Sequence, residues 1–172
     1  EARAGRWVSG TFGWWWRYED GNYPTSTQLR IDGAIYRFNA RGYMVTGWVY
    51  EDGQWYYYGA SGGQSAGWVR VHGTWYYLDP LTGAMASGWT KVQGTWYYLS
   101  SSGAMRTGWV RDGSAWYYLT SSGALATGWQ CVGSSWYYLS PDGGAMVTGW
   151  LRDGDAWYYL TSSGAMATGS RW

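Results

Sequence analysis

The sequence predicts an all-β protein built as a solenoid of stacked β-hairpins, and three observations predict this fold class. Gly-Trp pairs recur at intervals of 20 or 21 residues between Trp48 and Trp150, a period typical of solenoid repeats. Seven residues after each of these tryptophans comes a second Trp, which is always followed by Tyr-Tyr. The 172 residues include 17 Trp and 18 Tyr, so aromatic rings must supply most of the apolar surface that drives folding.

Each regular repeat is expected to form one hairpin. In the repeat that begins at Trp68, a turn at His72-Gly73 sets Arg70 opposite Trp75. Side chains alternate across a strand, so the hairpin has two different faces. We call them the Trp face, made of Trp68, Arg70, Trp75 and Tyr77, and the aliphatic face, made of Val69, Val71, Tyr76 and Leu78.

A second kind of turn is expected to preserve this register. In the repeat that begins at Trp109, the glycine comes one residue earlier in the turn. A loop from Asp112 to Ala115 nevertheless sets Arg111 against Trp116. The segments between hairpins are short and rich in turn residues, so they should carry the chain from one hairpin to the next.

The repeats divide the chain into two regions. Residues 47–172 form six regular repeats, of which the last is truncated, and residues 1–46 form degenerate N-terminal repeats or a cap. In the segment 28–38, Leu29 and Ile35 replace both tryptophans and Arg37 replaces the second tyrosine. Because Arg37 would be the third wall of any site using Trp7 and Trp14, we expect residues 14–16 to pack as a cap.

The C-terminal end of the array is expected to be open. Gly169-Ser170 stands where the next Gly-Trp is expected, so Trp150 and Trp157 lack a following hairpin. Their half-site is open unless Trp172, another protomer or a missing continuation completes it. An open end with exposed strand and rings favours self-association.

Composition and motifs argue against several other functions. The formal net charge of +1 does not favour nucleic-acid binding, and no apolar run is long enough for a membrane span. The single cysteine, Cys131, permits neither an intramolecular disulfide nor a thiolate metal cluster. The only histidine, His72, lies in a hairpin turn. We therefore expect a chain that is not an enzyme and uses no metal or cofactor.

The repeat motif resembles a known family. The order Gly-Trp, Trp-Tyr-Tyr-Leu, Gly-Ala-Met and Thr-Gly-Trp is similar to the choline-binding, or cell-wall-binding, repeats of Gram-positive surface proteins and phage lysins, over residues 47–169. The resemblance implies a left-handed superhelix of hairpins. It also implies an extracellular, wall-associated module, cut from a larger secreted protein, that binds choline or phosphocholine of teichoic or lipoteichoic acid.

The resemblance also implies ligand sites between consecutive hairpins. Each would combine both tryptophans of one repeat with the second tyrosine of the next: Trp48, Trp55 and Tyr77; Trp68, Trp75 and Tyr98; Trp89, Trp96 and Tyr118; Trp109, Trp116 and Tyr138; Trp129, Trp136 and Tyr159. The residue four before the next Gly-Trp tryptophan would form the floor, namely Gln64, Met85, Met105, Leu125 and Met146 in the same order. The first tyrosines (Tyr76, Tyr97, Tyr117, Tyr137 and Tyr158) are then expected in the core.

The chemistry of three rings around a void agrees with this assignment. Ring faces carry negative quadrupole charge and attract a quaternary ammonium, which has no N–H to donate. Position +2 after the first Trp holds Arg70, Lys91, Arg111 or Arg152. These cations either meet the phosphate of phosphocholine or, as we favour, form a solvated face whose stems cover the rings.

Two other functions remain open on the sequence alone. One is a glucan- or oligosaccharide-binding module, similar to the repeats of glucosyltransferases and clostridial toxins, in which the rings would stack on sugars. The other is a structural spacer or adhesive stalk with no saturable ligand. Sugar sites favour amide and carboxylate groups beside a flat ring, whereas the predicted cages contain Trp, Trp, Tyr and usually Met.

Overall fold

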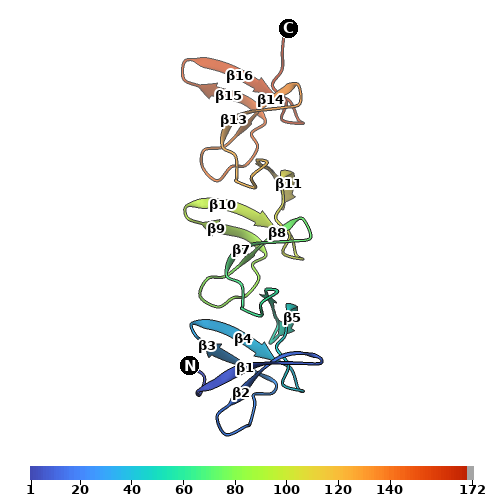
Figure 1. The fold of residues 1–172 in the computed structure, drawn as a ribbon. Coiled ribbons are helices and arrows are strands. Elements are labelled where there is room, and N and C mark those ends of the chain that lie inside the picture. Colours follow the sequence, from blue (N-terminus) through green and yellow to red (C-terminus); the bar gives the residue numbers. More distant parts are fainter. Residues whose placement is uncertain (170–172) are drawn as a thin grey trace. The chain divides into compact units, whose positions relative to one another are not determined.

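The computed structural model describes residues 1–169, and this part of the chain folds into successive two-stranded antiparallel hairpins (Figure 1). The predicted all-β architecture of repeated hairpins is confirmed. Within the described residues there is no helix, and hence none of the length and apolarity needed to cross a membrane. The chain divides into two compact units, Glu1–Ala86 and Ser87–Trp172.

The hairpins follow one another along the sequence in both units. The first unit contains β1 (Gly5–Gly10), β2 (Gly13–Tyr18), β3 (Thr27–Ile31), β4 (Ala34–Phe38), β5 (Gly47–Glu51), β6 (Gln54–Tyr58), β7 (Gly67–Val71) and β8 (Thr74–Leu78). The second unit contains β9 (Gly88–Val92), β10 (Thr95–Leu99), β11 (Gly108–Asp112), β12 (Ala115–Leu119), β13 (Gly128–Val132), β14 (Ser135–Leu139), β15 (Gly149–Asp153) and β16 (Ala156–Leu160). Each odd-numbered strand pairs with the even-numbered strand that follows it.

Two turn chemistries give the same register, as predicted. Between β7 and β8 the turn residues His72 and Gly73 both have positive φ, 49° and 83°, which is the pattern of a type I′ turn. Between β11 and β12, Gly113 has a φ of 60° and the next residue is not left-handed, which is the type II′ pattern. The cross-strand pairs Arg70–Trp75 and Arg111–Trp116 are equivalent.

The fully buried side chains lie at the end of the second strand of every hairpin after β1–β2. In the second unit they are Leu99, Leu119, Leu139 and Leu160, all with no exposed surface. In the first unit the same position holds Phe38, Tyr58 and Leu78, which are equally buried. Burying one such apolar side chain stabilises the fold by about 1.5–3 kcal/mol. These residues, rather than the first tyrosines of the Tyr-Tyr pairs, form the core.

Within each unit, linking segments form backbone hydrogen bonds to the preceding hairpin. In the second unit, Leu125 forms a bridge with Leu119 of its own hairpin, and its backbone N–H donates to the carbonyl of Trp96 in the preceding hairpin. Met146 repeats this arrangement, with its N–H bonded to the carbonyl of Trp116 at 2.7 Å. The bonds satisfy carbonyl groups at strand edges that would otherwise lack a protein partner. They also fix the spacing between consecutive hairpins.

A glycine in the linking segment allows this close stacking. Gly123 has a φ of 86°, and a Cβ at this position would come within 2.5 Å of the Met105 sulfur. A side chain here would therefore combine an unfavourable backbone conformation with a steric clash. The recurrent Ser-Gly-Ala sequence thus serves packing between repeats.

Candidate functional site

A cavity opens between the hairpins β9–β10 and β11–β12 of the second unit. It measures about 340 Å³ and is lined by Trp89, Trp96, Tyr117, Leu125 and Gly143. The rings of Trp89 and Tyr117 meet edge to face, with centroids 5.0 Å apart and planes inclined by 68°. The Trp face of one hairpin thus meets the aliphatic face of the next, and the following linking segment closes the cage.

The next pair of hairpins in the second unit repeats this cavity. Its volume is about 250 Å³, and its lining comprises Trp109, Trp116, Tyr137, Met146, Ser162 and Ser163. The rings of Trp109 and Tyr137 lie 4.9 Å apart. Each cage therefore draws residues from three consecutive repeats, because Ser162 follows β16.

The same ring geometry recurs elsewhere in both units. Trp129 lies 4.9 Å from Tyr158, and Trp48 lies 4.9 Å from Tyr76. The rings of Trp48 and Trp55 are nearly perpendicular, at 88°, with centroids 6.4 Å apart. The linking segments again bond to the second tryptophan, through the pairs Met85–Trp55 and Met166–Trp136.

The predicted third wall of the cages is wrong by one residue. The cavities contain the first tyrosine of the next repeat, which is only half buried, instead of the second. The second tyrosine pairs across the hairpin with the first Trp of its own repeat and packs against it, at centroid distances of 4.9–5.1 Å. Those pairs are Trp68–Tyr77, Trp89–Tyr98, Trp109–Tyr118, Trp129–Tyr138 and Trp150–Tyr159.

The predicted floor residue also belongs one repeat further along. Leu125, not Met105, lines the cavity of Trp89 and Trp96. Met146 lines the cavity of Trp109 and Trp116, where Leu125 was expected. The reason is the backbone bond from each linking segment to the preceding hairpin, which carries the floor residue back by one repeat.

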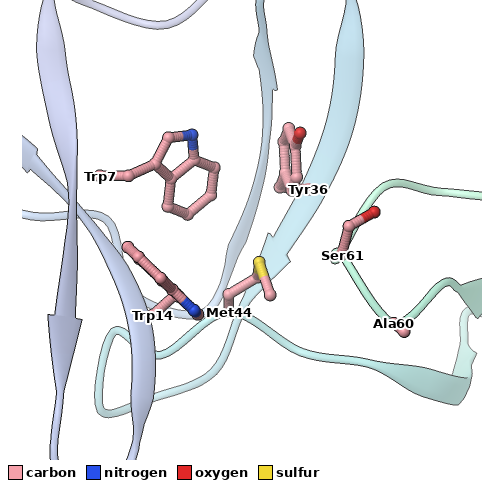
Figure 2. A pocket seen from close by; sticks show the side chains of 6 residues that line it. All are labelled: Trp7, Trp14, Tyr36, Met44, Ala60 and Ser61. Carbon is pink, nitrogen blue, oxygen red and sulfur yellow. The ribbon is translucent and has the colours of Figure 1, made fainter.

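The N-terminal hairpins form a cage that the sequence analysis did not predict. A cavity of about 360 Å³ is lined by Trp7, Trp14, Tyr36, Met44, Ala60 and Ser61 (Figure 2). Figure 2 shows the indole of Trp7 facing Tyr36, with the Met44 sulfur below them. The Trp7 and Tyr36 centroids are 4.8 Å apart. Trp14 is therefore a cage wall, whereas Trp16, only 8% exposed, packs in the core as expected.

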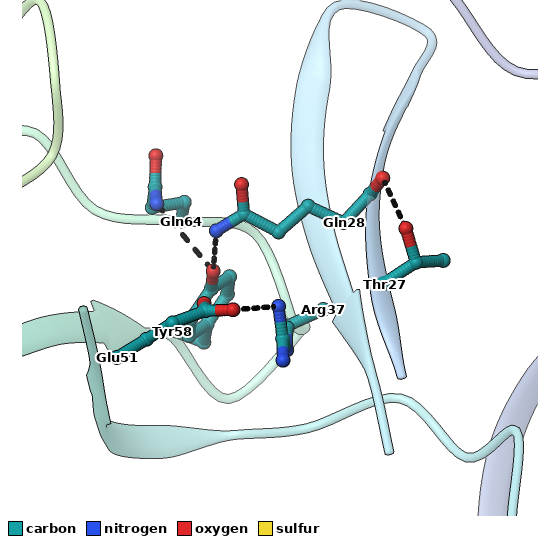
Figure 3. Close-up of polar contacts among 6 residues, drawn as sticks. All are labelled: Thr27, Gln28, Arg37, Glu51, Tyr58 and Gln64. Atoms are coloured by element: carbon teal, nitrogen blue, oxygen red, sulfur yellow. Dashed lines mark hydrogen bonds and ion pairs between the residues drawn. The ribbon is translucent and has the colours of Figure 1, made fainter. Parts of the chain in front are cut away.

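The following junction, between β3–β4 and β5–β6, carries polar groups where the other junctions within the two units carry rings. The register pairs Gln28 with Arg37, so Gln28 and not Leu29 takes the place of the first tryptophan. Gln28 and Gln64 both donate to the Tyr58 hydroxyl, at 2.7 and 3.4 Å (Figure 3). Arg37 forms an ion pair with Glu51 at 2.6 Å. We call this group of Gln28, Arg37, Glu51, Tyr58 and Gln64 the polar lock. Arg37 belongs to it and is not a cage wall.

Burial perturbs the central hydroxyl of this polar lock. Desolvation raises the pKa of Tyr58 above 10.0, and the bonds from Gln28 and Gln64 oppose the shift only in part. A raised folded-state pKa means that the contribution of the neutral hydroxyl to stability is fully present at neutral pH. That contribution is lost only as the pH rises above the ordinary tyrosine range.

The cations at position +2 lie outside the cages. Arg70, Lys91, Arg111 and Arg152 are exposed. The Arg70 guanidinium is 6.0 Å from the Trp75 ring centroid, and the Lys91 ammonium is 5.8 Å from that of Trp96. Lys91 is not among the residues lining the Trp89–Trp96 cavity. This arrangement agrees with a solvated face whose long side chains cover the rings.

Two predicted sites need residues outside their own unit or outside residues 1–169. Trp68 and Trp75 belong to the first unit and their predicted partner, Tyr98, to the second, so this site stays a prediction. Trp150 and Trp157 are 69% and 61% exposed, and no hairpin follows them within residues 1–169. Trp172, which could complete their site, lies outside the described residues. The described residues contain no group of His, Cys, Asp and Glu side chains suited to hold a metal ion.

Comparison with solved structures reveals close relatives of this architecture. Choline-binding protein F from Streptococcus pneumoniae, crystallised with a peptidoglycan analogue, aligns with a TM-score of 0.83 and 38% identity over 92% of this chain and 57% of that one. The modular autolysin LytC from Streptococcus pneumoniae aligns with a TM-score of 0.69 and 32% identity over 95% and 37%. The pneumococcal cell wall endolysin from phage Cp-1, complexed with choline, aligns with a TM-score of 0.54 and 36% identity over 73% and 38%.

The chain spans little more than half of the first of these proteins, and about two fifths of the other two. No curated protein sequence matches it significantly. The sequence model of the choline-binding repeat matches residues 25–66, 52–88, 86–127 and 126–171, which together span most of the chain. With hairpins, cages and repeat motif in agreement, this chain belongs to the choline-binding repeat family.

Proposed function

We propose that this chain is a non-catalytic module that binds choline groups and thereby holds a larger secreted protein on choline-bearing teichoic or lipoteichoic acid at the bacterial cell surface. The observation that carries the proposal is the cavity enclosed by Trp89, Trp96 and Tyr117. Three electron-rich rings around a void complement a trimethylated nitrogen, which binds through cation–π attraction and apolar contact. The repeats in the solved endolysin, which was crystallised with choline, support the same ligand class.

The lining of the cages favours choline over a sugar. The Trp89–Trp96 cavity is lined by two indoles, a phenol, a leucine and a glycine, with neither an amide nor a carboxylate side chain among them. A pyranose ring needs hydrogen-bonding partners for its hydroxyl groups, because polar groups that lose water without a replacement bond weaken binding. A quaternary ammonium needs none.

Several cages on one chain can together bind a polymer tightly although each cage binds choline weakly. A cation–π contact contributes about 0.5–2 kcal/mol, so three contacts give a dissociation constant of the order of millimolar. Cavities occur at the junctions of Trp7, Trp89 and Trp109, and the same Trp–Tyr ring contact recurs at Trp48 and Trp129. A polymer that carries many choline groups can engage several cages at once and raise the apparent affinity about 10² to 10⁴ fold.

A choline titration of the whole chain tests the proposal. We expect a saturable change in tryptophan fluorescence, a rise in Tm, and retention on choline-substituted agarose but not on ethanolamine-substituted agarose. The matched small-molecule control is the neutral isostere of choline in which tert-butyl replaces trimethylammonium; it should produce a much weaker response. A response to dextran with none to choline would establish the glycan-binding alternative. No response to either choline or dextran would favour a structural spacer.

A further inference from the structure

Two of the cage tryptophans are bonded to a carboxylate of the next hairpin. The indole N–H of Trp89 donates to Asp112 at 2.9 Å. The indole N–H of Trp129 donates to Asp153 at 2.8 Å. Both aspartates are the last residue of the first strand of their hairpin, β11 or β15. They therefore lie on the aliphatic face, which is the face that meets the preceding hairpin.

The intervening repeat lacks this carboxylate. At the equivalent register position β13 ends in Val132, which pairs with Ser135 as Asp112 pairs with Ala115. The turn after Val132 has the same type II′ pattern, with a φ of 63° at Gly133. Valine has no acceptor for the indole of Trp109. The second unit thus alternates between cages with and without a carboxylate on the first tryptophan.

The carboxylate acts on the cage from outside. Asp112 does not line the cavity of Trp89, Trp96 and Tyr117. Its bond to the indole N–H holds the Trp89 ring in one orientation before any ligand arrives, which reduces the ordering cost of binding. Its negative charge also attracts a cation, and this attraction adds to that of the negative ring face.

We infer that Asp112 and Asp153 are positioning residues that strengthen the Trp89 and Trp129 cages for a quaternary ammonium, which gives the module two classes of site. This inference rests on the proposed function. The carboxylate charge should make choline binding in these two cages about twofold to fivefold tighter than it would be without it, the range typical of exposed charge pairs. Added salt should reduce the advantage, because exposed charges are screened.

The test resolves the cages individually in the full chain. Choline chloride is titrated at constant ionic strength, and the indole N–H resonances of Trp89 and Trp109 are followed by NMR in isotope-labelled protein. Asp112→Asn retains an acceptor oxygen but removes the charge. Asp112→Val imitates the intervening repeat, and Val132→Asp adds a carboxylate next to Trp109. Comparing variants within one cage removes the effect of the different floor residues, Leu125 and Met146.

We expect both Asp112 variants to raise the choline midpoint of the Trp89 cage about twofold to fivefold without moving that of the Trp109 cage. Val132→Asp should lower the midpoint of the Trp109 cage by a similar factor. Sodium chloride should weaken the unmodified Trp89 cage more than the Asp112→Asn cage. An unchanged Trp89 midpoint in Asp112→Asn, or in Val132→Asp an unchanged Trp109 midpoint, overturns the inference. Absence of any choline-dependent shift in the unmodified protein would instead refute the proposed function.

Discussion

Replacing Trp96 by alanine is expected to weaken choline binding at the cage of Trp89, Trp96 and Tyr117 about tenfold to thirtyfold. The substitution removes one of two indole walls, and a desolvated indole–cation contact is worth about 2 kcal/mol. Site-resolved choline titration of the indole N–H resonances measures the effect. The cage of Trp109, Trp116 and Tyr137 provides the internal control, and its midpoint should not change.

The two tyrosines of one repeat should divide their effects between two cages. Tyr117→Ala removes the third wall beside Trp89 and should weaken that cage. Tyr118→Ala removes the ring that supports Trp109, 5.0 Å away in the same hairpin, and should weaken the next cage instead. Weakening of the Trp89 cage by Tyr118→Ala, with none by Tyr117→Ala, would restore the assignment made from the resemblance and contradict the geometry.

Replacing Leu119 by alanine is expected to lower the free energy of unfolding of the second unit by about 2–5 kcal/mol. Leu119 has no exposed surface and bridges to Leu125, so its loss leaves a cavity next to the junction between repeats. Urea denaturation followed by circular dichroism measures the change. Leu81→Ala, in the first unit, is the control for truncating an exposed leucine, because Leu81 is 96% exposed and its truncation should cost less than about 0.5 kcal/mol. Equal costs for the two substitutions would contradict the assignment of the core.

The architecture follows directly from the sequence because its signals are local. The Trp spacing, the alternation of faces and the two Gly-containing turns act within one hairpin, where register is set by a few neighbouring residues. The observed pairs Trp68–Tyr77 and Arg70–Trp75 are those that the sequence predicts. The turns recur every 20 or 21 residues, which leaves little freedom for any other β arrangement.

The errors concern contacts between repeats, where local signals are weaker. The alternation of faces alone could have located the third wall. It places Tyr118 beside Trp109 in its own hairpin, and leaves Tyr117 on the aliphatic face that meets the preceding Trp face. The floor residue could not be located in this way. Its position depends on the bond from the Leu125 N–H to the Trp96 carbonyl, which no side-chain pattern encodes.

The N-terminal cage was missed for a related reason. Arg37 stands at the position of a second tyrosine, and the resemblance made that position a cage wall, so its loss argued against a site. With the wall assigned to the first tyrosine, Tyr36 completes the cage of Trp7 and Trp14 (Figure 2). The polar lock was not predicted because the repeat alignment placed Leu29 at the position of the first tryptophan. The observed register places Gln28 there, opposite Arg37.

A crystal structure of the full chain grown with choline tests the central claim most directly. We expect a trimethylammonium group between Trp89, Trp96 and Tyr117, with its nitrogen within about 6 Å of each ring centroid. Equivalent density should occupy the cages of Trp7 and Trp109. Rings closed on one another with no guest between them, or choline bound away from the indole faces, would contradict the account.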